Sequence, residues 1–376
     1  IYKPFGLWTL GLVVIIKHIV SKAIHTNIFQ RRYIQTIQIF HTILIDNTAS
    51  LAVALFIGVA TAASVPAWED WAHGRVQLKN VSMHFRYAGS GPPLLLVHGN
   101  PQHSITWRLL GPAMAENYTV IAPDNRGMGD SSLAPISDYT AASMASDLEG
   151  LLSFLNINKT FVFSYDKGVG AAVALAAKKP SLVQALAVSE YALPGFGYES
   201  LWTPQYDWDA YGNWELAWWS VPEAAERFIQ GRVREVIGWF FYHTSYSGAS
   251  SIPLSAVDEV VDSINKPGFL RSMLGPFAAS TMGADAAFFN STIRQHPLPM
   301  PFLGLGGEAG TAAILHELWP PVGTSVEVDI VPKAGHFPAD ENPAWVAQRI
   351  NKFYNPHKKG ISTADLSWLT DKVTLV

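Results

Sequence analysis

The chain of 376 residues contains no cysteine. That absence excludes a disulfide framework, a thiolate metal site and a cysteine nucleophile. Charge is sparse as well, since charged residues make up 15% of the chain and the formal net charge is -4. There is no basic stripe with interleaved aromatic residues, so we expect no nucleic-acid partner. The apolar fraction of 49% instead indicates a packed globular protein.

Long apolar runs are also missing. Residues 6–16 and 51–63 are apolar, but neither run reaches the roughly 18 residues that span a bilayer unaided. The second run ends in small residues before Ser64, as the hydrophobic region of a secretory signal does. We therefore expect a leader at 1–64 and a secreted protein or one of the secretory pathway. The alternative is a membrane anchor, with membrane contact through this leader.

Four Asn-x-Ser/Thr triplets give weak support to secretory transit and glycosylation, because such triplets also arise by chance. They begin at Asn80, Asn117, Asn158 and Asn290.

From Val76 onward, short apolar segments alternate with segments of helical spacing. This alternation predicts an α/β protein whose mostly parallel sheet is covered on both faces. The expected strands are a hairpin over 76–87 and segments 94–97, 118–123, 160–164, 185–189, 300–305 and 325–331; the expected helices include 141–155, 168–179 and 343–354.

The strand–helix alternation stops after Pro194. Residues 195–292 are rich in aromatic residues and have helical patterns such as 222–241, which predicts a helical lid inserted into the α/β protein. The expected organisation is therefore a leader at 1–64, a core formed by 65–194 and 293–358, a lid at 195–292 and a tail at 359–376.

The segment FVFSYDKGVGAA (161–172) is the strongest chemical signal. A strand runs into a helix through a turn of the form small-x-nucleophile-x-Gly, which places Asp166 at the apex of a nucleophile elbow. A carboxylate there can attack carbon and form an ester. The alternative interpretation is a helix N-cap. Ser164 is a poor nucleophile candidate, because Val162 and Asp166 would then occupy the flanking positions that must be small.

Two further segments complete a catalytic pattern. His98-Gly99-Asn100-Pro101 follows an apolar strand, and the N–H of Asn100 with that of Lys167 would form an oxyanion hole. The alternative is a simple turn. His336 lies in AGHFPADENP (334–343) after a late strand, where an imidazole could activate the water that hydrolyses an ester on Asp166.

The histidine needs a carboxylate partner to fix its tautomer and stabilise its cation. Glu190 follows the strand 185–189, and Glu308 follows the strand 300–305. Both residues are at the carboxyl ends of expected parallel strands, so the pattern alone leaves both open.

Together these segments resemble the epoxide hydrolase and haloalkane dehalogenase branch of the α/β-hydrolase superfamily. The likeness spans roughly residues 75–356 and rests on HGNP (98–101), APDNRGMGDSS (122–132), the Asp-centred elbow, LPGFG (193–197) and GHFPADENP (335–343). The resemblance implies an α/β-hydrolase fold with an inserted lid. Some dehalogenases of the branch place the acid where Glu190 lies and epoxide hydrolases more often where Glu308 lies; we favour Glu190.

The chain also departs from the families it resembles. Haloalkane dehalogenases hold the halide between an Asn and a Trp; Asn100 matches the Asn, but Lys167 replaces the Trp. Fluoroacetate dehalogenases have two arginines after the nucleophile; Lys167 could imitate one, but Gly170 stands at the other position. Epoxide hydrolases use two lid tyrosines, and a rough alignment puts Glu215 and Phe277 there.

The lid therefore needs another proton donor. A Glu215 protonated by burial could serve, and the alternative is a plain surface carboxylate. Tyrosines elsewhere in the lid could also donate, and its tryptophans could wall an apolar pocket. The tyrosines are Tyr206, Tyr211, Tyr242 and Tyr246; the tryptophans are Trp202, Trp208, Trp214, Trp218 and Trp219.

The resemblance implies an epoxide hydrolase-like enzyme that acts on a small apolar substrate without a cofactor or metal. Asp166, His336 and Glu190 would be its catalytic residues. The alternatives are dehalogenation through the same ester and a ligand-binding protein that keeps the fold without turnover. The sequence does not indicate an oligomeric state.

Overall fold

The computed structural model describes residues 65–134, 137–204, 206 and 208–369. The expected leader at 1–64 and the end of the expected tail lie outside these residues. Among the helices of the described ranges, none is long and apolar enough to cross a membrane.

The described chain is built on an eight-stranded sheet of order β1-β2-β4-β3-β5-β6-β7-β8. β1 and β2 form a hairpin as predicted, although it begins at Ala72 and not at Val76; β2 is also antiparallel to β4, and the remaining neighbours are parallel. The sheet is therefore mostly parallel, as predicted. The strands are β1 (Ala72–Gln77), β2 (Ser82–Ala88), β3 (Pro93–Val97), β4 (Thr119–Pro123), β5 (Thr160–Tyr165), β6 (Val183–Ser189), β7 (Phe302–Gly307) and β8 (Val326–Val331).

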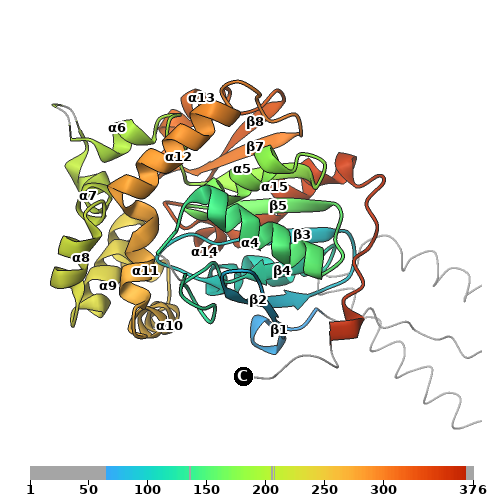
Figure 1. The fold of residues 1–376 in the computed structure, drawn as a ribbon, viewed down its shortest axis with the longest axis horizontal. Helices are drawn as coiled ribbons and strands as arrows, with labels where there is room; N and C mark the ends of the chain where they lie inside the picture. Colours follow the sequence, from blue (N-terminus) through green and yellow to red (C-terminus); the bar gives the residue numbers. More distant parts are fainter. Residues whose placement is uncertain (1–64, 135–136, 205, 207, 370–376) are drawn as a thin grey trace, which may run out of the picture. The chain divides into compact units, whose positions relative to one another are not determined.

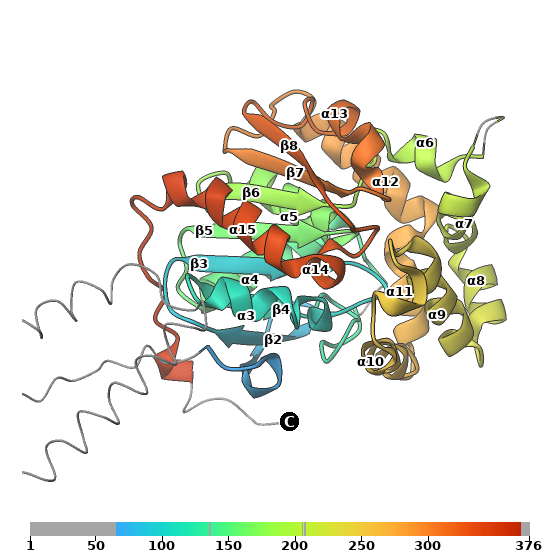
Figure 2. The same ribbon diagram turned by 180° about the vertical axis from the view of Figure 1, so that it is seen from behind.

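Helices cover both faces of the sheet. α4 (Ala141–Phe154) and α5 (Gly168–Lys178) lie in front of it in Figure 1, and α3 (Leu110–Ala115) and α15 (Pro343–Tyr354) lie in front in the view from behind (Figure 2). Successive side chains of a strand point to opposite faces, so β3 supplies both cores. Leu94 and Leu96 pack in one hydrophobic cluster, and Leu95 and Val97 in the other.

A set of helices lies between β6 and β7 in the sequence, where the lid is expected. They gather beside the carboxyl ends of the parallel strands in both ribbon views (Figures 1 and 2). They are α6 (Tyr198–Trp202), α7 (Ala210–Trp219), α8 (Pro222–Ile229), α9 (Val233–Thr244), α10 (Leu254–Ile264), α11 (Phe269–Leu274) and α12 (Ala279–Thr292). Two short helices, α13 (Leu315–Leu318) and α14 (Pro338–Glu341), follow in the second part of the core.

The helical pattern predicted over 222–241 is interrupted. The chain forms α8 and α9, separated by a turn in which Gly231 has φ of 80°. This left-handed conformation suits glycine, which has no Cβ, and it ends the helix. The helical spacing of apolar residues in 222–241 continues across this turn, so the sequence pattern did not reveal the break.

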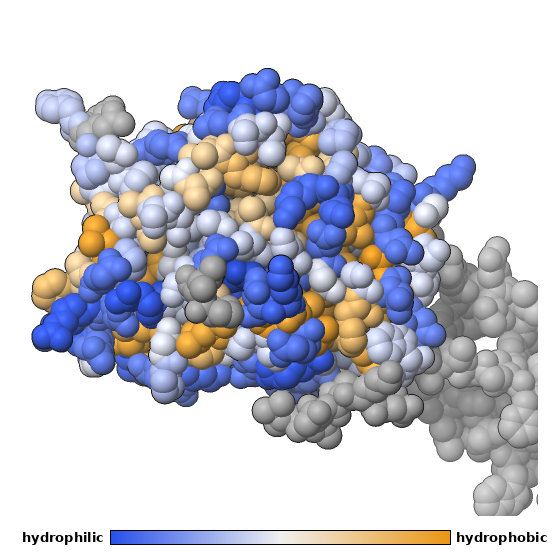
Figure 3. Space-filling view, in the orientation of Figure 1, coloured by the Kyte–Doolittle hydropathy of each residue, from blue (hydrophilic) through white to orange (hydrophobic). Residues whose placement is uncertain are grey.

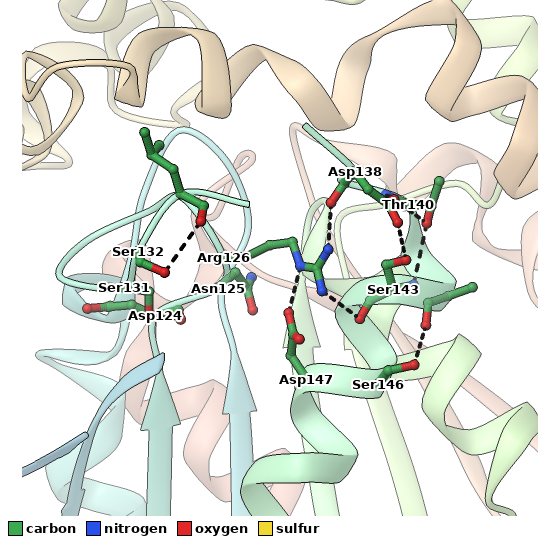
Figure 4. A network of polar contacts seen from close by, with 12 residues as sticks. Asp124, Asn125, Arg126, Ser131, Ser132, Asp138, Thr140, Ser143, Ser146 and Asp147 are labelled. Carbon is green, nitrogen blue, oxygen red and sulfur yellow. Dashed lines mark hydrogen bonds and ion pairs between the residues drawn. The ribbon is translucent and has the colours of Figure 1, made fainter. Parts of the chain in front are cut away.

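The loop after β4 is fixed by a buried polar network (Figure 4). Arg126 donates to Asp147 of α4 at 2.6 Å and to the carbonyl oxygen of Asp138 at 2.7 Å. On the other side, Asp124 accepts a hydrogen bond from the N–H of Ser104 at 2.8 Å and lies 2.7 Å from the ring of His84. The 122–132 stretch thus connects the sheet to α4 and to the loop after β3.

The face of the molecule seen in Figure 3 mixes hydrophilic and apolar residues. Of the four Asn-x-Ser/Thr triplets, three begin at exposed asparagines in loops; they are Asn80, Asn117 and Asn158.

Candidate active site

Asp166 lies in the tight turn between β5 and α5. Its backbone has φ of 48°, which is unfavourable for a residue with a side chain and marks a strained turn. The turn needs two glycines, because a Cβ at Gly168 would lie 2.2 Å from the carbonyl oxygen of His98, and one at Gly99 would lie 2.4 Å from Asp166. The small residues of the elbow therefore permit the close approach that places the carboxylate above the sheet.

The structure brings Asp166, His336 and Glu190 together from three separate loops. His336 Nε2 lies 3.5 Å from Asp166 Oδ2, and its Nδ1 lies 3.2 Å from Glu190 Oε2. The backbone N–H of His336 donates to the carbonyl oxygen of Thr244 at the end of α9. The imidazole is thereby held between a carboxylate at the elbow and a second carboxylate at the end of β6.

Glu190 is fixed by several donors to its other oxygen. Its Oε1 accepts hydrogen bonds from the N–H of Gly307 at 2.6 Å, and from the N–H and hydroxyl of Thr311 at 3.0 and 2.9 Å. Oε2 is left for His336. Glu308, the other expected acid, is exposed and accepts from the N–H of Lys333 instead. It directly follows β7 and is absent from the lining of the cavity that holds the histidine.

Two opposing effects set the charge of His336. Burial lowers the pKa of the imidazole, but hydrogen bonds to Asp166 and Glu190 outweigh burial and raise the pKa to about 10. The two carboxylates thus favour the protonated form of the imidazole.

One of the two N–H groups of the expected oxyanion hole already has an acceptor. The N–H of Asn100 donates to Asp166 Oδ1 at 2.7 Å. The N–H of Lys167 lies at the start of α5 next to Asp166 and has no acceptor among the described residues. Asp166 Oδ1 is therefore bound by a hydrogen-bond donor, and Oδ2 faces the histidine.

A cavity of about 480 Å³ opens above these residues and is walled by the lid. Its lining includes Asp166, His336 and Glu190, together with Glu215 of α7. Glu215 is buried, and its Oε2 has no hydrogen-bond partner among the described residues. Burial raises the pKa of Glu215 to about 7. The alternative prediction, that Glu215 is a plain surface carboxylate, is therefore wrong.

Only one of the four candidate lid tyrosines reaches this cavity. Tyr211 lines it, whereas Tyr206, Tyr242 and Tyr246 are exposed and lie outside its lining. In α9 the side chains of Phe240, His243 and Thr244 face the cavity. Tyr242 points away from it, because successive helical residues are about 100° apart.

The lid tryptophans do not line the cavity as expected. Trp214 and Trp218 line a separate outer groove of about 580 Å³ on the lid, and Trp219 is buried in the lid core. The aromatic wall comes instead from four other residues. They are Tyr191, Tyr198, Phe240 and Phe277, which join Tyr211 in the lining.

Sequence reasoning missed Tyr191 and Tyr198. Both follow β6, and Tyr198 begins α6 directly after the LPGFG segment. The hydroxyl of Tyr198 lies 2.8 Å from Nζ of Lys167. The sequence could have indicated both residues, because they follow a strand that ends at the site and ligands bind at the carboxyl ends of such strands.

A group with the spacing of metal ligands lies outside this cavity. His84, Asp124 and Asp130 have ligand atoms within 4.8 Å of one another. Asp124 and His84 are hydrogen-bonded to each other, and Asp130 pairs with Lys266 at 2.9 Å. We interpret the group as part of the network that fixes the loop after β4.

Comparison with known proteins agrees with this geometry. Residues 92–193 match the family described as alpha/beta hydrolase fold. A soluble epoxide hydrolase of Corynebacterium sp. (strain C12) is 30% identical over 292 residues, which cover 76% of this chain and 97% of that protein.

The chain belongs to the α/β-hydrolase superfamily.

A second relative, together with the soluble epoxide hydrolase, places this α/β-hydrolase in the epoxide hydrolase and dehalogenase branch, and a solved structure shares its fold. A fluoroacetate dehalogenase of Burkholderia sp. is 25% identical over 309 residues, or 78% of this chain and 97% of that protein. The crystal structure of Cfl2 from Burkholderia cenocepacia has a TM-score of 0.71 at 26% identity and covers 75% of this chain and 95% of that one. The protein is a hydrolase of this branch, as the resemblance predicted.

Proposed function

We propose that this α/β-hydrolase opens epoxides of small apolar molecules through an ester on Asp166. The observation that carries the proposal is the arrangement of the Asp166 carboxylate, with Oδ1 held by the N–H of Asn100 and Oδ2 facing His336. Oδ2 would attack a ring carbon, the C–O bond would break and its electron pair would pass to the oxygen. Oδ1 would then be the carbonyl oxygen of the ester.

The second half of the reaction follows from the charge of His336. Esterification removes the negative charge of Asp166, one of the two carboxylates that raise the pKa of the imidazole. The pKa of His336 would fall, so that the imidazole can accept a proton from water as the water attacks the ester carbonyl. The N–H groups of Asn100 and Lys167 would stabilise the oxyanion. As it collapses, the imidazolium would return its proton to the departing alkoxide oxygen, the diol would leave, and the Asp166 carboxyl group would lose its remaining proton to solvent.

Dehalogenation is a second candidate, because the same attack on a haloalkane would expel a halide and give the same type of ester. The likeness to a fluoroacetate dehalogenase supports keeping it. Binding without turnover is less well supported, since His336 contacts both Asp166 and Glu190.

A single turnover in ¹⁸O-labelled water, with enzyme in excess over styrene oxide, tests the ester. Because water attacks the carbonyl carbon and not the substrate, the first diol should carry no label. The peptide containing Asp166 should gain the heavy oxygen. A labelled first diol, with an unlabelled Asp166 peptide, would show direct attack by water and contradict the proposal.

We further expect Glu215 to protonate the leaving epoxide oxygen. A Glu215→Gln variant, which keeps the shape but has no acidic proton, should open styrene oxide about 100-fold more slowly. In the parent the active form is the protonated acid, so opening should decline as pH rises through about 7, near the pKa of Glu215. Stopped-flow measurement of epoxide opening between pH 5 and 9 checks both expectations. A Gln variant with parental rates would exclude this role.

A further inference from the structure

The amine of Lys167 is buried in the wall of the active-site cavity. The residue is 3% exposed and lines the cavity beside Asp166. Within the described residues it forms no ion pair. The nearest groups are the hydroxyl of Tyr198 at 2.8 Å and the sulfur of Met282 at 3.4 Å from Nζ.

Aromatic rings surround the ammonium group. Nζ lies 4.3 Å from the ring centres of Tyr198 and Phe277 and 5.3 Å from that of Tyr191. Ring faces attract cations, so these contacts offset part of the cost of removing the charge from water. The rings do not satisfy the N–H donors of the ammonium group, however, because a ring face accepts no more than a weak hydrogen bond.

One N–H donor of the ammonium group is left for a ligand. An ammonium group has three N–H donors and no acceptor. The oxygen of Tyr198 accepts one, and the sulfur of Met282 is a weak acceptor for a second. No acceptor for the third donor is present in the described part of the chain. A buried cation without an anionic partner is costly, and an anion formed in the cavity would satisfy it.

We propose that the ammonium of Lys167 binds the leaving atom of the substrate and stabilises its negative charge as the bond to carbon breaks. The proposal rests on the function proposed above, and it assigns the side chain a role in ester formation, separate from that of the Lys167 N–H in ester hydrolysis. As Asp166 Oδ2 bonds to carbon, the electron pair of the broken bond passes to the leaving atom. An epoxide oxygen would take its proton from Glu215, whereas a halide would remain an anion bound by Lys167.

This assignment defines the substrate class. The site should accept electrophiles whose leaving atom becomes a small anion at the carbon attacked, which includes epoxides and haloalkanes. A purely structural lysine, which only holds Tyr198 at the start of α6, would not distinguish the two halves of the reaction.

The charge of Lys167 should depend on pH. Burial lowers the pKa of the ammonium to about 7, although the nearby carboxylates oppose this shift. Ester formation should therefore be fastest at low pH and should decline as the ammonium loses its proton. The titratable groups that face Lys167 from the surrounding elements are Asp166, Tyr191, Tyr198, Glu215 and Asp285.

The test measures ester formation alone, in a His336→Gln background that cannot hydrolyse the ester. Two probes are used, styrene oxide and 1-bromobutane, and the rate at which the protein gains mass is followed. Bromide needs no proton to leave, so this probe reports on Lys167 independently of Glu215. The variants are Lys167→Met, which removes the charge at similar length, Lys167→Arg, which keeps a permanent charge, and the exposed Lys79→Met as a matched control.

We expect Lys167→Met to slow ester formation with both probes about 100- to 1,000-fold, as the loss of a preorganised donor does. Lys79→Met should match the parent. With 1-bromobutane, the parent rate should fall as pH rises through about 7, whereas the Lys167→Arg rate should stay level, because guanidinium keeps its proton. Both proteins retain Glu215, so the difference between them reports on the lysine.

A folded Lys167→Met variant that forms the ester as fast as its His336→Gln parent would overturn the inference while leaving the ester mechanism intact. Near-UV circular dichroism checks the fold. If this variant does not fold, the pH profile of the parent with 1-bromobutane decides, and a level profile between pH 6 and 9 would overturn the inference. Absence of any ester in the parent would instead remove the proposed function, and the inference with it.

Discussion

A His336→Gln variant is expected to react with a single equivalent of substrate and then stop. Ester formation requires the Asp166 carboxylate, which the substitution leaves in place, but ester hydrolysis requires a base for water. Glutamine has a similar shape and cannot accept the proton. Steady-state turnover should fall by at least about 10⁴-fold, as it does when the base of a catalytic unit is removed. Rapid-quench measurement of the product over the first turnovers checks this expectation.

The same variant changes the environment of the carboxylates. With the imidazolium gone, Asp166 and Glu190 lose the cation that lies between them at 3.5 and 3.2 Å. Some reduction of the first, ester-forming step is therefore expected, but it should be small beside the loss of the second. A variant that turns over continuously at more than about one hundredth of the parental rate would contradict the role given to His336.

Glu190→Gln and Glu308→Gln form a matched pair with opposite expected results. Glu190 accepts from Nδ1 of His336 and raises the pKa of the imidazole. Its neutral amide would favour the wrong tautomer and would not stabilise the cation, so ester hydrolysis should slow about 10³- to 10⁴-fold. Glu308 is exposed, and within the described residues its side chain accepts a single hydrogen bond, from the N–H of Lys333. Its Gln variant should keep the parental rate.

Burst kinetics distinguish the two variants. In Glu190→Gln the first equivalent of substrate should react quickly and the ester should then decay slowly. Comparable rates for both variants would mean that Glu190 does not support the histidine. Slow hydrolysis in Glu308→Gln alone would show that Glu308, and not Glu190, supports the histidine.

The parts of the fold that follow from local rules were predicted well. The last helix has the bounds expected from its periodicity, and the strands that carry Asp166 and Glu190 lie where apolar runs indicated. The elbow was predictable because a tight turn with close backbone approaches restricts Gly168 and its neighbours to small residues. These constraints act over a few residues, and a single sequence expresses them directly.

The choice between the two carboxylates was harder to predict. Both follow parallel strands, so both are brought to the same edge of the sheet. What separates them is the end of β7 and the loop after it, where Gly307 and Thr311 donate to Glu190 and so hold it beside the histidine. Such contacts join residues more than one hundred positions apart, and local pattern does not encode them.

The lid was the least predictable part of the site. A high aromatic content predicted aromatic cavity walls, but it did not show which aromatic residues face inward. Gly231 separates α8 from α9, Tyr242 lies on the side of α9 that faces away from the cavity, and Tyr246 follows the end of α9 outside the lining. Tyr198 lines it because α6 begins immediately after the turn that follows β6. Inward and outward faces depend on how short helices pack against one another.

The proposed reaction depends on a covalent bond between Asp166 and the substrate, and peptide mass spectrometry of the His336→Gln variant tests this bond most directly. After exposure to styrene oxide, the peptide that contains Asp166 should gain the whole mass of the epoxide, and after 1-bromobutane it should gain a butyl group. The double variant Asp166→Asn/His336→Gln should gain neither, and asparagine suits the positive φ of this position. Full modification of the double variant, or an unmodified Asp166 peptide in a single variant that has consumed substrate, would contradict the account.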